Sequence, residues 1–287
     1  MLGDWVKRSI VAGLVWLVVG PGIGVTSALA DDKLVVFCGS AVTPPLEEAA
    51  RGYQHANHTQ IIIHSGGSGT VLSQMRIARQ GDLYIPGSPD FMLKAVKYQA
   101  IYPETIERLA YLIPVISVPK GNPKRIASLK DLAKPGLRIA IANPESVCVG
   151  LYGVEILEYN GLLNHIRPNI VTQAASCELT ASLLVLESAD AVLGWDIFSK
   201  WRPDRIETVY LDPHQLPRIA YIPAAVSRFT KDRHRAETFL KYLASDKGRE
   251  VFSRFGYKVT EREARIYAPK AQLGGQYTLP ANWSLGH

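Results

Sequence analysis

Short apolar runs alternate along the chain with small polar loops and with segments whose apolar residues recur at helical spacing. The first three apolar runs, at positions 33–37, 61–63 and 82–85, are predicted to be strands. A loop rich in small residues follows each run and leads into a helical segment; in the first helix, Leu46 and Tyr53 belong to the same apolar stripe. Three repeats of strand, loop and helix predict a parallel α/β sheet.

A second α/β unit is predicted farther along the chain. Its strands are expected at 137–142, 170–171 and 191–195, and its helices at 149–160 and 176–188. The spacing of the apolar residues again alternates between the strand period and the helix period, so this region is expected to form a separate sheet with its own helices.

Two extended segments, at 111–118 and 221–227, are predicted to carry the chain between these units. Helices at 235–244 and 249–255, ended by Gly256, follow the second crossing. The fold class is therefore expected to be α/β, with two lobes joined by two crossover hinge strands and a ligand cleft between them. Lobe one is predicted to comprise residues 31–112 plus 227–287, and lobe two residues 113–226.

Residues 1–30 have the layout of a secretory signal peptide. Lys7 and Arg8 precede an apolar run at 10–19, and Ala28-Leu29-Ala30 supplies small residues before a cleavage site. An uncleaved membrane anchor is the alternative reading, but glycines and a proline interrupt the apolar stretch and leave it short for a span. We expect cleavage after residue 30 and export of a soluble chain.

Composition narrows the class of protein. The 287 residues are 47% hydrophobic and 20% charged with 3 Cys, which excludes a disordered chain and a disulfide scaffold. Lys and Arg number 32 against 26 Asp and Glu, a net charge of +6 that could favour an anionic ligand but is too diffuse to indicate nucleic acid. Neither a P-loop lysine nor an HExxH motif is present, so we expect no catalysis and no cofactor; an enzyme remains the alternative class.

Two loops of small residues are candidates for binding an anion. They are Gly39-Ser40-Ala41 and Gly66-Gly67-Ser68-Gly69-Thr70, each between a predicted strand and a predicted helix. Helix N-termini at the carboxyl ends of parallel strands present unpaired N–H groups, and serine adds a neutral donor. Each loop alone could be an ordinary helix cap. Two such loops in one lobe favour an anion site.

Five motifs carry a family resemblance. They are Ser65-Gly66-Gly67-Ser68-Gly69, Asp82-Leu83-Tyr84-Ile85, Asn143-Pro144-Glu145-Ser146-Val147 with Gly150-Leu151-Tyr152, Ser188 to Gly194, and Tyr221 to Val226 through Phe255-Gly256-Tyr257. In this order, from about Val35 to Tyr257, the chain resembles the periplasmic molybdate-binding proteins of ABC importers. The resemblance implies a type II periplasmic binding protein that closes on molybdate, tungstate or a related oxyanion and delivers it to an inner-membrane permease. We expect it to work as a monomer in the periplasm.

The resemblance also implies binding contacts on both lobes. The family's serine in the second loop corresponds to Ser68, and its backbone contact after the Asn-Pro-Glu turn corresponds to Val147. The family's first-loop serine corresponds to Ala41, where neighbouring Ser40 can substitute after a small shift. The expected ligand-binding residues are Ser40, Ala41, Ser68, Gly69, Val147, Cys148 and Trp195.

Other departures from the family pattern bear on the ligand. Cys148 stands where proline is usual, and Trp195 replaces a tyrosine donor but keeps an indole N–H. Asp196 follows immediately, and a carboxylate near the cleft would repel an oxyanion.

The three cysteines are predicted to lie at the cleft. Cys38 ends the first strand of lobe one, whereas Cys148 and Cys177 begin helices of lobe two. One interpretation is a Cys148–Cys177 disulfide beside a buried Cys38, as an oxidising compartment favours. The other is a site in which the three thiolates, with Asp196, hold a thiophilic ion such as Cu(I), Zn(II) or As(III). Both interpretations remain open from the sequence.

Overall fold

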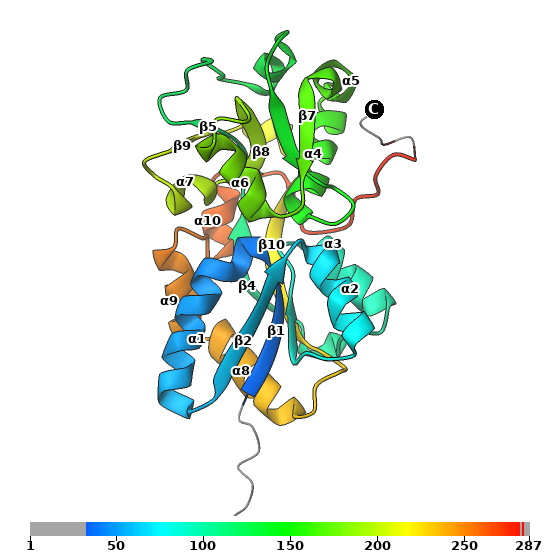
Figure 1. Cartoon of the computed structure of the whole chain (residues 1–287), viewed down its shortest axis with the longest axis vertical. Helices are drawn as coiled ribbons and strands as arrows, with labels where there is room; N and C mark the ends of the chain where they lie inside the picture. Colours follow the sequence, from blue (N-terminus) through cyan, green and yellow to red (C-terminus); the bar gives the residue numbers. More distant parts are fainter. Residues whose placement is uncertain (1–32, 282, 284–287) are drawn as a thin grey trace, which may run out of the picture. The chain divides into compact units, whose positions relative to one another are not determined.

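The computed structural model describes residues 33–281 and 283, so the predicted signal peptide lies outside the described residues. The chain forms two β-sheets with helices around each, in the order drawn in Figure 1. This confirms the predicted fold class, a two-lobed α/β protein, and we call the lobe that contains the first strand the first lobe.

The first lobe is built on a mixed sheet of order β11-β10-β3-β1-β2, with β4 paired to β10. Its strands are β1 (Lys33–Gly39), β2 (Gln60–Gly66), β3 (Leu83–Ile85), β4 (Glu107–Leu112), β10 (Arg218–Val226) and β11 (Gln272–Leu273). The three strands that the repeats predict are parallel to one another, whereas β10 runs antiparallel to β3 and β4.

Helices cover both faces of this sheet, because successive side chains of a strand point to opposite faces. Leu34 and Val36 of β1 pack under α1, α8 and α9, and Phe37 packs on the other face against α2 and α3. Figure 1 shows these two groups of helices on opposite sides of the strands. The helices are α1 (Thr43–Asn57), α2 (Ser68–Ala78), α3 (Pro89–Lys97), α8 (Arg233–Ala244) and α9 (Asp246–Arg254).

The second lobe has a five-stranded sheet of order β7-β6-β8-β5-β9. Its strands are β5 (Pro114–Pro119), β6 (Ile139–Ala142), β7 (Ile170–Ala174), β8 (Ala191–Trp195) and β9 (Ile206–Val209). Its helices are α4 (Cys148–Tyr159), α5 (Leu163–Ile166), α6 (Cys177–Val185) and α7 (Phe198–Trp201). The predicted cap of α6 is confirmed, since Ser176 Oγ accepts from the N–H of Leu179 at 3.1 Å.

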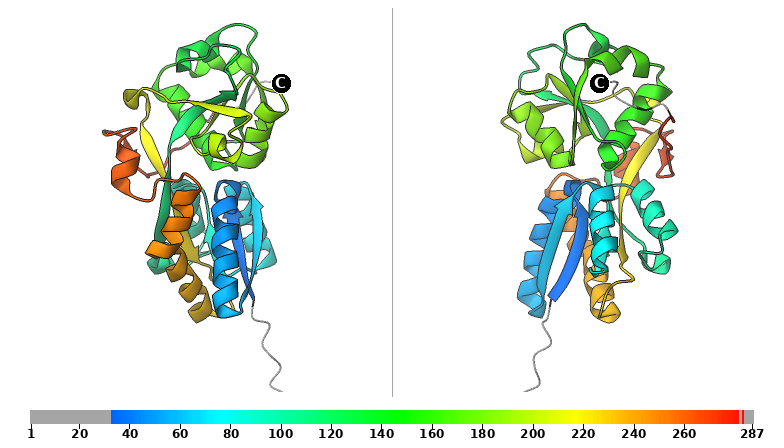
Figure 2. Two further views of the ribbon diagram at one scale, coloured as in Figure 1. Left: turned by 90° about the vertical axis from the view of Figure 1, so that its left-hand side faces the viewer. Right: turned by 45° about the vertical axis from the view of Figure 1, so that its right-hand side comes forward.

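The extended segment predicted at 111–118 proves to be two strands. β4 ends at Leu112 in the first sheet, and β5 starts at Pro114 in the second, so the chain changes lobes at Ile113. β4 and β10 pair antiparallel, with Tyr111 opposite Tyr221, and together they form the link between the lobes that Figure 2 shows edge-on.

The C-terminal segment packs on the second lobe. Helix α10 (Glu261–Arg265) and the residues after it place Ala264, Ala268 and Ala271 in the same apolar cluster as Val115 of β5. The sequence-based division assigns this segment to lobe one; that division stays a prediction. None of the helices within the described residues is long and apolar enough to cross a membrane.

Candidate functional site

Loops of the first lobe meet two helix N-termini of the second lobe. The Gly69 N–H donates to the Ser146 carbonyl at 2.8 Å, just before α4. The Cys177 N–H, at the start of α6, donates to Ser40 Oγ at 3.0 Å. Loops that are distant in sequence thus meet between the two sheets, and this junction is the candidate site.

Glycine lets the two lobes approach closely here. A Cβ atom on Gly67 would lie 2.9 Å from the Ala175 carbonyl oxygen and 3.0 Å from that of Ser146. A Cβ on Gly87 would lie 2.6 Å from Cys148 Sγ. The loops after β2 and β3 therefore touch the second lobe through backbone, which a larger residue would prevent.

Two buried serines present hydroxyl groups at this junction. Ser68 Oγ accepts from the Gly87 N–H at 3.1 Å and lies beside the Cys148 sulfur. Ser40 Oγ accepts from the N–H of Cys177, and less closely from that of Glu178 at 3.4 Å. Each hydroxyl also has one hydrogen of its own to donate. That of Ser68 faces the Cys148 sulfur, and that of Ser40 faces the Cys177 sulfur.

The Cys148 and Cys177 thiols lie side by side, and both are free and buried. The hydrogen bond to Cys177, together with burial, raises the pKa of Cys148. Burial by itself raises the pKa of Cys177, but Cys148, Trp195, the Val149 N–H and Ser40 all favour its thiolate, and together they lower the pKa. Within the pair, Cys177 is therefore the more acidic thiol and Cys148 the less acidic one.

Trp195 supplies an unused donor. Its ring is fully buried and packs edge-on against Tyr152, with ring centroids 5.3 Å apart. Nε1 has no acceptor at hydrogen-bond distance and angle among the described residues, yet it lies near enough to the Cys177 sulfur to favour that thiolate. A buried indole N–H without an acceptor is unusual and indicates a place where an anionic group is favoured.

The structure brings together most of the residues expected to bind the ligand. Ser40, Ser68, Gly69, Cys148 and Trp195 all lie at the junction described above. The Ala41 carbonyl accepts from the Tyr257 hydroxyl. The Val147 N–H, expected to be a backbone donor to the ligand, is instead bonded to the Asn143 carbonyl at 2.8 Å within the turn. The Val149 N–H faces the site instead.

The four groups of the thiophilic-ion interpretation are not gathered. Cys38 faces the side of β1 under α1, where its sulfur lies 3.7 Å from Thr43 Oγ1. Asp196 turns toward the crossover and bonds Lys258 Nζ at 2.8 Å and the Ile113 N–H at 3.2 Å. Within residues 33–281 and 283, no group of three or more His, Cys, Asp or Glu side chains is placed to hold a metal ion. The expected repulsion between Asp196 and an oxyanion is also reduced, because Lys258 neutralises the charge of that carboxylate.

A buried charge cluster near this junction has no counterpart in the sequence-based prediction. Arg218 of β10 donates to both carboxylate oxygens of Glu155 on α4, at 2.6 to 2.9 Å, and to Asp90 Oδ1 on α3 at 3.1 Å. Its guanidinium lies over the Tyr152 ring, 4.4 Å from the centroid. The Tyr277 N–H also donates to Asp90 Oδ1, at 2.9 Å. We call Asp90, Glu155 and Arg218 the interlobe charge cluster, because it joins helices of both lobes to a crossover strand.

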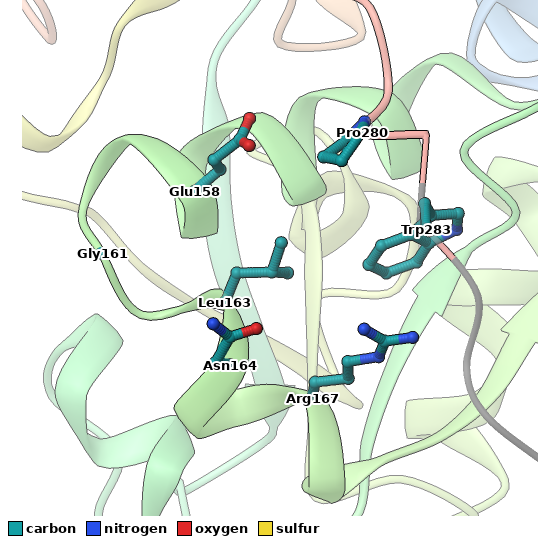
Figure 3. Close-up of a pocket in the computed structure, with 7 residues that line it drawn as sticks. All are labelled: Glu158, Gly161, Leu163, Asn164, Arg167, Pro280 and Trp283. Carbon is teal, nitrogen blue, oxygen red and sulfur yellow. The ribbon is translucent and has the colours of Figure 1, made fainter.

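Two pockets bear on where a ligand enters. One of about 300 Å³ is lined by Ser40 together with Thr43 and Pro44 of the first lobe and Glu178 and Ala181 of the second. Ser40 is the one expected ligand-binding residue that lines it. The other, of about 230 Å³, lies between α5 and the C-terminal segment, where Figure 3 shows Arg167 facing Trp283. None of the residues expected to bind the ligand lines this second pocket.

The two-lobed α/β fold is that of solved periplasmic binding proteins. The profile of the bacterial extracellular solute-binding proteins matches residues 34–258, and the chain belongs to that family. Members of this family are solute-binding proteins of transport systems rather than enzymes.

Two relatives that are named as binding proteins agree with this assignment. The chain is 25% identical over 160 residues to a Haemophilus influenzae protein named as a binding protein, covering 56% of this chain and 64% of that protein. It is 24% identical over 269 residues to the molybdate-binding protein ModA of Escherichia coli, covering 90% of this chain and 100% of that protein.

Two solved structures share the fold. The Azotobacter vinelandii periplasmic molybdate-binding protein superimposes with a TM-score of 0.69 at 20% identity, covering 79% of this chain and 100% of that one. The sulfate-binding protein SubI of Mycobacterium tuberculosis gives a TM-score of 0.73 at 14% identity, covering 84% and 93%.

Proposed function

We propose that the protein is the periplasmic solute-binding component of an ABC importer and that it captures a tetrahedral oxyanion, molybdate or tungstate, between its lobes. One observation carries the proposal: uncharged donors from both lobes surround the two buried thiols at the lobe junction. The Ser40 hydroxyl, Trp195 Nε1 and the Val149 N–H lie beside the Cys177 sulfur, and the Ser68 hydroxyl lies beside the Cys148 sulfur. An inner-membrane permease would receive the ligand.

The chemistry of these donors favours a fully ionised oxyanion. Hydroxyl, indole and helix N-terminal N–H groups hold a dehydrated anion through aligned dipoles, without a countercharge. A protonated anion such as hydrogen phosphate also needs an acceptor for its own proton. The nearby carboxylate, Asp196, already accepts from Lys258 and from the Ile113 N–H. The ModA relative supports molybdate, and the SubI neighbour makes sulfate the competitor to test.

Binding of a panel of anions to the purified protein tests the proposal. We expect molybdate and tungstate to raise the melting temperature and to give a saturable calorimetric isotherm, because a ligand bound only by the folded state stabilises it. Sulfate and phosphate are expected to bind more weakly. Binding of none of the four oxyanions would refute the oxyanion function.

A thiophilic ion is the second candidate, because two thiols lie together at the site. Soft ions such as Cu(I) prefer thiolate ligands, and two thiolates suffice for linear coordination of that ion. Adding Cu(I), Zn(II) and arsenite to the panel separates the two functions. Stabilisation by these ions alone, abolished in Cys148→Ser, would favour the thiophilic ion over the oxyanion.

Ser68→Ala is expected to weaken molybdate binding about tenfold, since it removes one hydrogen-bond donor to a charged ligand. Ser65→Ala, three residues earlier in β2, is the matched control: its hydroxyl is exposed and pairs with Thr43 Oγ1 at 2.6 Å. Isothermal titration calorimetry of both variants checks this. Equal affinities for the two variants would contradict the role of Ser68.

Gly67→Ala is expected to fold normally but to close poorly. Gly67 has φ −62° and ψ 138°, which alanine adopts freely, whereas the added methyl group would press on the carbonyl oxygens of Ala175 and Ser146 across the interface. We expect about fivefold weaker molybdate binding and a larger radius of gyration with ligand in small-angle X-ray scattering, because closure is part of binding. Gly52→Ala, within α1 of the first lobe, should match the wild type. Wild-type compaction of Gly67→Ala would refute the steric argument.

A further inference from the structure

The two cysteines of the site lie next to each other as free, buried thiols. Each begins a helix of the second lobe, and the two helix starts meet at Gly67, where an added Cβ would lie 2.9 Å from the Ala175 carbonyl oxygen and 3.0 Å from that of Ser146. The two thiols interact with each other there. Each is 1% exposed. A third thiol, on Cys38, lies apart from them beside Thr43. The chain therefore contains one adjacent pair of thiols and one separate thiol.

We propose that Cys148 and Cys177 are a reversible dithiol–disulfide pair whose oxidation state sets how tightly the cleft holds its anion. The disulfide part of this inference stands on the thiol geometry alone, and the effect on affinity rests on the proposed oxyanion function. Small-molecule disulfides are the class of oxidant.

The exchange balances in two steps. The Cys177 thiolate attacks one sulfur of a small disulfide such as oxidised glutathione, forms a mixed disulfide and releases one glutathione thiolate. The Cys148 sulfur, losing its proton to that thiolate, then attacks Cys177 Sγ and displaces the second glutathione thiolate. The protein loses two electrons and one disulfide becomes two glutathione molecules. Cys177 is the attacking residue because its surroundings favour the thiolate.

The first lobe controls access to this pair. Gly87 contacts the Cys148 sulfur, and Ser40 receives the hydrogen bond of the Cys177 N–H. An oxidant can therefore reach the sulfurs only when the first lobe moves away from α4 and α6. Ligand-driven closure should protect the pair from oxidation.

Oxidation should also strengthen anion binding. In the reduced pair, the Cys177 sulfur is oriented toward Trp195 Nε1 and the Val149 N–H, so it competes with an anion for these donors. A thiolate at this position would also repel the anion, whereas a disulfide carries no charge. Drawing Cys177 Sγ into a bond with Cys148 also frees those donors. We expect the oxidised protein to bind molybdate about tenfold more tightly.

Counting thiols tests the pair itself. Purified ligand-free protein is equilibrated over a range of reduced to oxidised glutathione, quenched in acid, unfolded, alkylated and analysed by mass spectrometry. We expect three alkylated cysteines under reducing conditions and only Cys38 after oxidation, with Cys148 and Cys177 in one linked pair of peptides. Cys38→Ala, which leaves the pair intact, should go from two alkylated cysteines to none. Free Cys148 and Cys177 at every ratio, or a linkage that includes Cys38, would overturn the proposal.

Calorimetry on each redox form tests the effect on the cleft. Molybdate affinity should differ between the two forms of the wild type and of Cys38→Ala, whereas Cys177→Ser should show no dependence on the glutathione ratio. Saturating molybdate should slow oxidation at least about tenfold. Equal affinities for the two forms would refute the control of binding. If molybdate binds neither form, the oxyanion function and the effect on affinity both fail, while the thiol counts still decide whether the disulfide forms.

Discussion

Replacing Arg218 by methionine is expected to lower the free energy of unfolding by about 3–5 kcal/mol, because two buried carboxylates would lose their countercharge. The Arg218 side chain is 4% exposed, Asp90 1% and Glu155 12%. Urea denaturation of the variant and the wild type measures the loss. Arg233→Met is the matched control: that arginine also contacts two carboxylates, of Glu104 and Glu237, but is 44% exposed, and should cost at most about 1 kcal/mol.

The loss in free energy of unfolding caused by Arg218→Met should be smaller at acidic pH. Burial raises the pKa of Glu155 above 4.5, and Arg218 offsets part of that increase. Without Arg218 the pKa in the folded protein rises further above that of the unfolded chain. Stability from the protonated carboxyl is then fully present below pH 4.5 and is lost as pH rises through the folded-state pKa. A deficit that does not depend on pH would argue for lost packing instead.

A neutral cluster separates loss of charge balance from loss of contacts. The triple variant Asp90→Asn, Glu155→Gln, Arg218→Met removes all three charges while keeping similar volumes, and we expect it to recover most of the lost stability. A triple variant as unstable as Arg218→Met would show that the hydrogen bonds of the guanidinium, rather than its charge, stabilise the junction.

The fold could be predicted largely from local patterns. Strands, loops and helices of the first lobe alternate within windows of about ten residues, so Leu46 and Tyr53 suffice to identify α1 and its buried face. The same holds for α6, whose cap at Ser176 is visible in the sequence. By contrast, the extended segment around Ile113 is divided into two strands because its two halves pair in different sheets. Strand β9 has only four residues. Neither has a local signal.

The site was predictable as a set of loops but not as a set of contacts. Ser40 and Ser68 could be named because glycine and serine stand between a strand and a helix. The partners of Asp196 could not, since Lys258 is 62 positions away and the charge of that carboxylate depends on it. The interlobe charge cluster joins positions 90, 155 and 218, which no periodicity connects. Long-range ion pairs therefore account for most of what the sequence leaves open.

Trp195→Phe is expected to weaken molybdate binding about 100-fold, because a hydrogen bond to a charged group contributes about 1.5–3 kcal/mol. Trp195 Nε1 has no acceptor at hydrogen-bond distance and angle in the described part of the chain, so its removal costs the protein only its contact with the Cys177 sulfur. Phenylalanine keeps an aromatic ring against Tyr152. The free energy of unfolding without ligand should therefore fall by only about 1–2 kcal/mol, the cost of a smaller buried ring.

Trp195→Tyr is the matched variant, since it differs from Trp195→Phe by one hydroxyl group. A tyrosine can donate a hydrogen bond toward the same anion, so we expect its affinity to lie between those of the wild type and of Trp195→Phe. Calorimetric titration with molybdate, beside urea denaturation without ligand, separates loss of a donor from loss of packing. Equal affinities for the phenylalanine and tyrosine variants would show that Trp195 acts through its ring alone, and the anion would then have to be held by the two serines and the N-terminus of α4.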